Sequence, residues 1–275
     1  LEGSMQKISE LLQSSLIKNE GQLYLSHRAV EVSTKSSNSP WMVDVIDKKG
    51  NLKKFFGSDV ICTLPPQALL TLIPTNVDLP IAYQERLVKL PKPSGALVLY
   101  GVVERKSLPP NCPKHIQLEV EDPGSIFLSI SRDGDGRAPI GEATIIASVF
   151  TEVDFWEKFD LGNYELSKEV YLEKILKAIN SYFGIGLESW LHKELATPRS
   201  FAKWTGRPLG IVGGLGQDPR NFGPFGLPSR TPMKGLWLCG DSIYPGEGTA
   251  GVSQSALMVC RQLMEQRGKE LRVPL

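Results

Sequence analysis

Residues 235–263 read Gly-Leu-Trp-Leu-Cys-Gly-Asp-Ser-Ile-Tyr-Pro-Gly-Glu-Gly-Thr-Ala-Gly-Val-Ser-Gln-Ser-Ala-Leu-Met-Val-Cys-Arg-Gln-Leu, and this stretch decides the fold. The apolar run at 236–239 is suited to a short buried strand. Gly240 and Asp241 end that strand with a turn pair, which leaves a carboxylate at the carboxyl end of the strand.

Three glycines, at positions 246, 248 and 251, then lead into a helix that we expect to begin near Val252. Glycine allows the backbone to approach a ligand closely, and a helix N-terminus offers free N–H groups with a partial positive charge. Strand, acidic turn, glycine loop and helix together predict a site for a polyhydroxylated or anionic cofactor. The alternative is an ordinary αβ packing unit with a flexible loop.

The bulk composition is that of a folded protein. The chain has 275 residues, of which 41% are hydrophobic and 22% charged, and its net charge of +1 gives no strong electrostatic case for nucleic acid or an anionic membrane. Its four cysteines are scattered, which favours a reducing compartment without disulfides or a zinc site. The opening residues Leu-Glu-Gly-Ser-Met show no targeting pattern and suggest a fragment of a longer protein.

Periodicity predicts a mixed α/β (α+β) chain. Helices are expected at 4–18, 79–90 and 161–183, with a short helix or loop at 67–73. Strands are expected at 22–33, 41–46, 51–56, 59–64, 95–104, 116–120, 125–131, 143–150 and 187–196. The four runs between 95 and 150 suggest an antiparallel sheet, whereas 197–230 is aperiodic and rich in Gly and Pro, as functional loops often are.

Other candidate sites are weaker. The Asp133-Gly134-Asp135 motif lacks the later ligands of a calcium loop and is typical of a turn. The three histidines follow no metal-ligand spacing, so no metal is expected. An N-terminal G-x-G-x-x-G motif after a strand is absent, so the sequence offers the closing half of a dinucleotide site without the opening half.

These residues resemble a known family. Residues 236–252 resemble the C-terminal FAD motif of phytoene desaturase and carotenoid isomerase enzymes, within the amine-oxidase-like flavoproteins, and Glu2-Gly-Ser-Met-Gln is similar to the family's Gly-Gly-Met-Gln. Several short stretches resemble the cyanobacterial carotenoid C-3',4' desaturase branch of this family. They are residues 93–96, 134–139, 143–148, 196–201, 210–217, 222–226, 230–232 and 245–253. The resemblance covers nearly the whole chain.

The resemblance implies part of a Rossmann-like FAD-binding domain at 1–78 and 231–275, with an antiparallel-sheet substrate domain at 79–230. Asp241 would bond the ribityl or pyrophosphate part of FAD, and Val30 would bond the adenine through its backbone. The full set of implied cofactor-binding residues is Val30, Leu64, Pro65, Gly240, Asp241, Gly248, Gly251, Val252 and Ser253. In this set, Gly251, Val252 and Ser253 would present N–H groups to the flavin's pyrimidine edge.

The implied activity is FAD-dependent desaturation of a carotenoid, forming the C-3',4' double bond of a myxol-type product. A carotenoid cis–trans isomerase and a cofactor-free, lipid-binding remnant are the alternatives. The expected lining of an apolar substrate tunnel is Leu97, Leu99, Phe127, Trp204 and Phe222, and no catalytic residue is assigned. We expect a cytoplasmic protein with peripheral membrane contact, through residues 68–73, and a fragment that by itself binds FAD weakly and is inactive.

Overall fold

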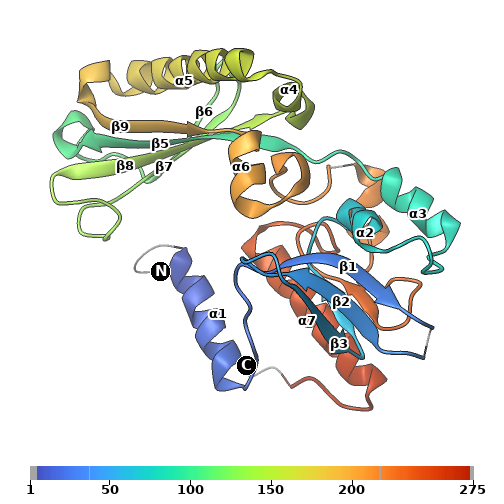
Figure 1. Cartoon of the computed structure of the whole chain (residues 1–275). Coiled ribbons are helices and arrows are strands. Elements are labelled where there is room, and N and C mark those ends of the chain that lie inside the picture. Colours follow the sequence, from blue (N-terminus) through green and yellow to red (C-terminus); the bar gives the residue numbers. More distant parts are fainter. Residues whose placement is uncertain (1–4, 37, 217, 273–275) are drawn as a thin grey trace. The chain divides into compact units, whose positions relative to one another are not determined.

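The computed structural model describes residues 5–36, 38–216 and 218–272, and it divides into two compact units (Figure 1). The first unit comprises residues 1–23 and 94–211, and the second comprises 24–93 and 212–275. The sequence placed its divisions after residues 78 and 230, whereas the compact units divide after 23, 93 and 211. The assignment of cofactor and substrate roles to the two parts stays a prediction.

The first unit is built on a five-stranded antiparallel sheet in the order β6-β7-β8-β5-β9. Its strands are β5 (Gly95–Glu104), β6 (His115–Leu118), β7 (Ile126–Ile130), β8 (Glu142–Thr151) and β9 (Trp190–Ala196). The predicted antiparallel sheet is therefore confirmed, with β9 as its fifth strand. Alternate residues of β8 are fully or almost fully buried, because a strand points successive side chains to opposite faces.

One face of this sheet is covered by α5 (Leu161–Phe183), as Figure 1 shows. The helix begins where the side chain of Asp160 accepts a hydrogen bond from the N–H of Asn163, and it ends at Gly184, whose φ of 67° suits glycine. Ile175 and Ile179 of α5 pack into the core of the unit together with the buried side chains of β5, β7 and β8.

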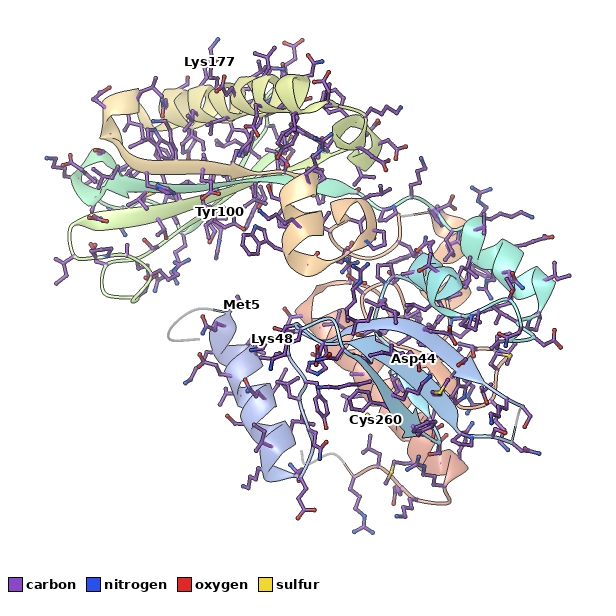
Figure 2. The ribbon with its side chains drawn as sticks, viewed as in Figure 1. Met5, Asp44, Lys48, Tyr100, Lys177 and Cys260 are labelled. Carbon is purple, nitrogen blue, oxygen red and sulfur yellow. The ribbon has the colours of Figure 1, made fainter. Side chains whose placement is uncertain are left out.

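The opposite face of the sheet is only partly covered and carries large side chains. Tyr100 and Phe127 are each 43% exposed and Phe150 is 79% exposed, although all three lie within strands. Figure 2 shows Tyr100 on this face and Lys177 on the outer side of α5. We call this surface the open sheet face.

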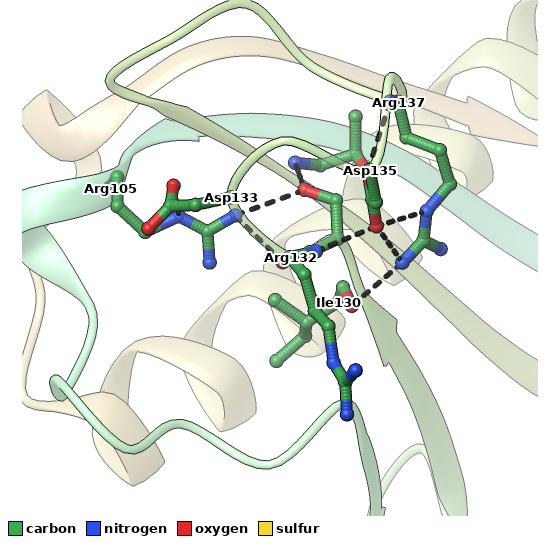
Figure 3. A network of polar contacts seen from close by, with 8 residues as sticks. Arg105, Ile130, Arg132, Asp133, Asp135 and Arg137 are labelled. Atoms are coloured by element: carbon green, nitrogen blue, oxygen red, sulfur yellow. Dashed lines mark hydrogen bonds and ion pairs between the residues drawn. The ribbon is translucent and has the colours of Figure 1, made fainter. Parts of the chain in front are cut away.

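The turn after β7 is tied to the sheet by two arginines (Figure 3). Arg105 donates to the carbonyl oxygen of Ser131 at 2.7 Å and lies 3.1 Å from the carboxylate of Asp133. Arg137 pairs with Asp135 at 2.7 Å, and this hydrogen bond lowers the pKa of Asp135 to about 2. Both carboxylates of the Asp-Gly-Asp motif are thus bound by arginine, which confirms the predicted turn.

Residues 197–230 are more regular than predicted, because α6 (Pro198–Thr205) follows β9 directly. A capping box starts this helix: the side chain of Thr197 accepts from the backbone of Ser200, whose side chain accepts from the N–H of Thr197. Arg199 of α6 donates to the carbonyl oxygen of Trp156 at 2.9 Å, and so fixes α6 on α4 (Val153–Glu157). The first unit also contains three short 3-10 turns. They are η1 (Arg105–Ser107), η2 (Leu187–Ser189) and η3 (Pro208–Gly210), of which only η3 lies within residues 197–230.

The first unit also contains α1 (Gln6–Lys18), a predicted helix that is confirmed. None of its described residues is buried, although Leu11, Leu12 and Ile17 are apolar. Residues 1–4, which include most of the motif similar to Gly-Gly-Met-Gln, lie outside the described residues, as does Gln217.

The second unit combines two small sheets. The antiparallel sheet has the order β1-β2-β3 and the parallel pair is β10-β4. The elements are β1 (Arg28–Thr34), β2 (Trp41–Ile46), β3 (Leu52–Gly57), β4 (Val60–Cys62), α2 (Pro66–Leu72), α3 (Ile81–Val88), η4 (Pro219–Asn221), η5 (Gly223–Phe225), β10 (Leu236–Leu238) and α7 (Gly248–Gln266). The predicted β2–β3 hairpin is confirmed, whereas β1 begins six residues later than expected.

One hydrophobic core joins β1, β2, the parallel pair, α2 and α3. It contains Val32 of β1, Trp41 of β2, Leu69 of α2, Leu87 of α3 and Leu238 of β10. The two sheets therefore pack as parts of one structure and hold the carboxyl ends of β4 and β10 in place.

Asp59, just before β4, should make stability in this unit depend on pH. Its carboxylate accepts hydrogen bonds from Trp237 Nε1 at 3.0 Å and from Arg267, the C-cap residue of α7, at 2.7 Å. Burial opposes ionisation, but these bonds outweigh it and place the pKa of Asp59 below its ordinary value. A lowered carboxyl pKa stabilises the fold above the unfolded pKa, and this contribution is lost as the pH falls through the folded pKa.

We therefore expect Asp59→Asn to unfold at a lower temperature than the unchanged chain at neutral pH, with the two melting curves converging below about pH 4. Asparagine keeps an acceptor for Trp237 and removes the charge. Circular dichroism melts across the acid range provide the measurement. A constant difference between the two chains at every pH would show that the charge of Asp59 does not stabilise the fold.

Candidate functional site

The candidate site begins where two parallel strands end side by side. Leu236 pairs with Val60 and Leu238 with Cys62, and the N–H of Cys239 donates to the carbonyl oxygen of Cys62 at 3.0 Å. Both strands therefore deliver their following residues to the same edge. In open α/β sheets, ligands bind at this carboxyl edge.

Gly240 and Asp241 leave β10 at this edge, as the sequence predicted. The N–H of Gly240 donates to Oγ of Ser255 at 3.1 Å, and Ser255 is fully buried on α7. The helix is thus fixed against the end of the strand. Sequence reasoning missed this role of Ser255, and the available signal was its position four residues after Gly251, on the same helix face.

The helix α7 begins at Gly248, so the predicted start near Val252 is wrong by four residues. Gly248 is already the first residue of the helix, because the preceding Glu247 takes the N-cap position with an extended backbone, at φ −85° and ψ 176°. Orphan N–H groups belong to the first turn of a helix. Val252 and Ser253 follow that turn, and their expected role as flavin donors stays a prediction.

Gly251 is fixed by close backbone approach. A Cβ atom at Gly251 would lie 2.4 Å from the carbonyl oxygen of Gly246, closer than real Cβ contacts. The loop from 246 to 251 therefore folds back on the first turn of α7, and only glycine allows it. The expected approach of Gly251 to a flavin stays a prediction, because the contact that requires glycine here is with Gly246.

A second loop is held against the first, and sequence reasoning missed it. A Cβ atom on Gly214 would lie 2.1 Å from the carbonyl oxygen of Asp241. The N–H of Gly214 donates to Oε2 of Glu247 at 2.9 Å. Glu247 thus joins the N-terminus of α7 to the Gly213-Gly214 pair, and that glycine pair was the available signal.

These loops enclose a pocket next to the carboxyl end of β10. Asp241 and Phe222, both from the predicted set, are among its lining residues. The lining comprises residues 214–216, 221–223, 226–227 and 241–247. The side chain of Asp241 is half-buried, and its Oδ1 accepts from Ser242 Oγ at 3.2 Å. An acidic group and a helix N-terminus thus lie beside one small pocket.

Val30 lies at a bulge in β1. The pairing with β2 passes from Ala29 opposite Val45 to Glu31 opposite Asp44, so Val30 has no partner residue across the ladder. A bulge of this kind leaves its extra residue unpaired. Leu64 and Pro65 follow β4 after Thr63, and Leu64 is exposed whereas Pro65 is buried.

The five residues predicted to line a substrate tunnel differ in their burial and in the unit to which they belong. Leu97 and Leu99 are fully buried in the core beneath α5, so the expectation that they line an open tunnel is corrected. The physical reason is strand alternation, which points them to the helix side of β5. Phe127 lies on the open sheet face, Trp204 of α6 is 80% exposed, and Phe222 belongs to the second unit.

Phe127 lines a shallow apolar pocket on the open sheet face, together with Phe150 and Ala96. His115 stacks on Phe127 with 5.6 Å between the ring centres. Among the described residues no group of His, Cys, Asp and Glu could hold a metal ion. None of the helices within the described ranges combines the length and apolar character needed to cross a bilayer.

The chain is similar in sequence to curated proteins named prolycopene isomerase. The chain is 31% identical over 200 residues to the chloroplastic prolycopene isomerase of Arabidopsis thaliana, covering 68% of this chain and 33% of that protein. It is 29% identical over 203 residues to the prolycopene isomerase of Daucus carota, covering 70% of this chain and 32% of that protein. The chain thus spans about a third of the length of these relatives. No protein-family model matches it.

Solved structures with similar folds are oxidases and oxidoreductases. A putrescine oxidase variant superposes with a TM-score of 0.67 and 16% identity, over 96% of this chain and 53% of that one. Cyclohexylamine oxidase from Brevibacterium oxydans superposes with a TM-score of 0.60 and 14% identity, over 95% of this chain and 53% of that one. An oxidoreductase from Methanosarcina mazei superposes with a TM-score of 0.62 and 15% identity, over 94% of this chain and 54% of that one. The mixed α/β fold is therefore that of amine oxidases, over about half of their length.

Proposed function

We propose that this chain is part of an FAD-dependent oxidoreductase that acts on carotenoids. The observation that carries the proposal is the edge where β4 and β10 end: Asp241 follows one strand, and the glycine loop leads from it into the N-terminus of α7. The similarity to prolycopene isomerases, and the fold shared with amine oxidases, support the same reading.

The residues at this edge fit a dinucleotide such as FAD. A Cβ added to Gly248 would meet nothing within 4 Å, so the backbone at the start of α7 faces open space. A helix N-terminus favours negative charge, and Asp241 offers a carboxylate that accepts from ribityl or ribose hydroxyls. The unpaired Val30 in the β1 bulge supplies backbone groups suited to a base edge.

When bound, the flavin would supply hydride or electron transfer. The chain's own residues would bind and orient it. Asp241 would accept hydroxyl hydrogens, and Glu247 and Gly214 would hold the two loops together. The first-turn N–H groups of α7 would face developing negative charge. The open sheet face would offer apolar contacts to a polyene, through Phe127 and Phe150.

Two reactions stand within this proposal. Desaturation at C-3',4' is supported by the motif resemblance of the loops around 210–232 and 245–253. Cis–trans isomerisation has equal support, because the similar curated proteins are prolycopene isomerases. The substrate is a lipophilic polyene in either case, and we propose peripheral membrane contact at a cytoplasmic location.

Product analysis separates these reactions. The whole protein that contains this chain is incubated with a poly-cis carotenoid, and separately with a 3',4'-saturated one, and the products are resolved by chromatography. A gain of one double bond would support the desaturase, and a change of geometry alone would exclude it. A purified protein without flavin absorbance, and without a thermal shift on addition of FAD, would instead indicate a cofactor-free remnant.

Asp241→Ala should weaken FAD binding without unfolding the protein. Loss of one charged hydrogen bond costs about 1.5–3 kcal/mol, or roughly 10- to 100-fold in Kd. Flavin fluorescence titration of the whole protein measures this change. Asp133→Ala, at a largely exposed carboxylate in the first unit, is the matched control. Equal flavin retention in both variants would refute the role assigned to Asp241.

A further inference from the structure

The N–H of Gly240 lies one residue beyond the bond that joins Cys239 to β4. Successive backbone groups of a strand point to opposite sides. The N–H of Leu238 accordingly donates away from β4, at 2.8 Å, and the N–H of Cys239 donates to the carbonyl oxygen that ends β4, at 3.0 Å. The N–H of Gly240 points away from β4 again, and Oγ of Ser255 on α7 is its acceptor, at 3.1 Å. A helix side chain thus continues the bonding pattern at the end of the strand.

The hydroxyl of Ser255 is fully buried and uses both of its bonding functions. It accepts from Gly240, and it donates to Sγ of Cys239 at 3.8 Å. Cys239 itself belongs to the small apolar cluster formed with Trp237 and Val259 between β10 and α7. A hydroxyl has one hydrogen to donate, so the bond to sulfur turns the oxygen's lone pairs toward the N–H of Gly240. The acceptor is therefore held in one orientation.

The turn that begins at Gly240 sets the direction of Asp241. Gly240 has a φ of 125°, in the region that favours glycine. Its carbonyl oxygen accepts from the N–H of Ile243 at 3.2 Å, which closes the turn. Gly240 is therefore held through its N–H by Ser255 and through its carbonyl by Ile243. Asp241 follows directly, so its place beside the pocket depends on these two bonds.

We infer that Ser255 is a positioning residue for the cofactor. By holding the N–H of Gly240, it fixes the turn that presents Asp241. Ser255 is fully buried, so it acts on the ligand through Asp241 and does not touch the ligand itself. The inference rests on the proposed function, in which Asp241 accepts hydrogens from the hydroxyls of FAD. The competing view is that Ser255 serves only the packing of α7 on β10.

A double-mutant cycle on FAD affinity separates these two views. The whole protein that contains this chain is stripped of flavin and titrated with FAD in four forms: unchanged, Ser255→Ala, Asp241→Ala and the double variant. Loss of one hydrogen bond to the turn should raise the Kd of Ser255→Ala about three- to tenfold. In the Asp241→Ala background the same substitution should raise Kd by less than about twofold, because the group that Ser255 positions is gone.

Ser229→Ala is the matched control. Ser229 is 2% exposed in the same unit, and its Oγ has no hydrogen-bond partner among the residues that the structure describes. This substitution removes a buried hydroxyl without removing a hydrogen bond, so Kd should stay unchanged. Circular dichroism melts of the flavin-free proteins show that each variant folds. Ser255→Cys, kept reduced, fills the same space with a weaker acceptor and should reproduce the Kd pattern of Ser255→Ala.

Three results would overturn the inference and leave the role of Asp241 standing. They are an unchanged Kd in Ser255→Ala, an equal rise of Kd in both Asp241 backgrounds, and a rise in Ser229→Ala as large as that in Ser255→Ala. The second of these would assign Ser255 to packing alone. An Asp241→Ala variant that binds FAD like the unchanged protein would instead refute the proposed role of Asp241, and the inference with it.

Discussion

Gly251→Val should give a folded protein that retains no flavin. A Cβ atom alone would lie 2.4 Å from the carbonyl oxygen of Gly246, so valine must push the loop away from the first turn of α7. That displacement would move the backbone at Gly248 and Asp241 out of the arrangement that faces the cofactor. The measurement is the flavin absorbance per protein molecule after purification, together with the FAD released on denaturation.

Ala256→Val is the control for this experiment. Ala256 is exposed on the same helix, and valine there brings the same side chain to a helical position without the contact at Gly246. It should keep its flavin. If Gly251→Val also purified with full flavin occupancy, the loop would not belong to the cofactor site.

Leu99→Ala should be the most destabilising of the substitutions considered for the first unit. Leu99 is fully buried between the sheet and α5, and removal of a core leucine costs about 2–5 kcal/mol through lost burial and the cavity left behind. Urea unfolding of the chain measures the loss. The result decides whether Leu99 is core or tunnel lining.

Phe127→Ala provides the contrast, because Phe127 lies half-exposed on the open sheet face. Its main folded-state contact is stacking on His115, so we expect a stability loss of about 1 kcal/mol or less, with a clear loss of polyene turnover in the whole protein. The opposite pattern, with Leu99→Ala folded at full stability and altered in substrate choice, would restore Leu99 to a tunnel wall.

Much of the fold follows from periodicity in the sequence. The strands around 95–104 and 143–150 were predictable because their alternation is strong, and α5 because an apolar stripe recurs between Val170 and Phe183. The edge at Gly240 and Asp241 was equally visible, since a short apolar run followed by Gly-Asp has few other structural readings. Local pattern and tertiary structure agree in these elements.

The remaining features depend on contacts that periodicity does not record. The start of α7 at Gly248 is set by the extended Glu247, whose carboxylate meets Gly214 thirty-three residues earlier in the chain. The α6 helix forms in a Gly- and Pro-rich segment because Thr197 and Ser200 cap it. The inward direction of Leu97 and Leu99 depends on which sheet face α5 covers, and strand alternation alone cannot choose between two faces.

The flavin content of the whole protein that contains this chain tests the central claim most directly. The protein is purified without added cofactor, its visible spectrum is recorded, and the released flavin is identified after denaturation. We predict about one FAD per protein molecule in the unchanged protein and none in Gly251→Val. A colourless protein that melts at the same temperature with and without FAD would contradict the account.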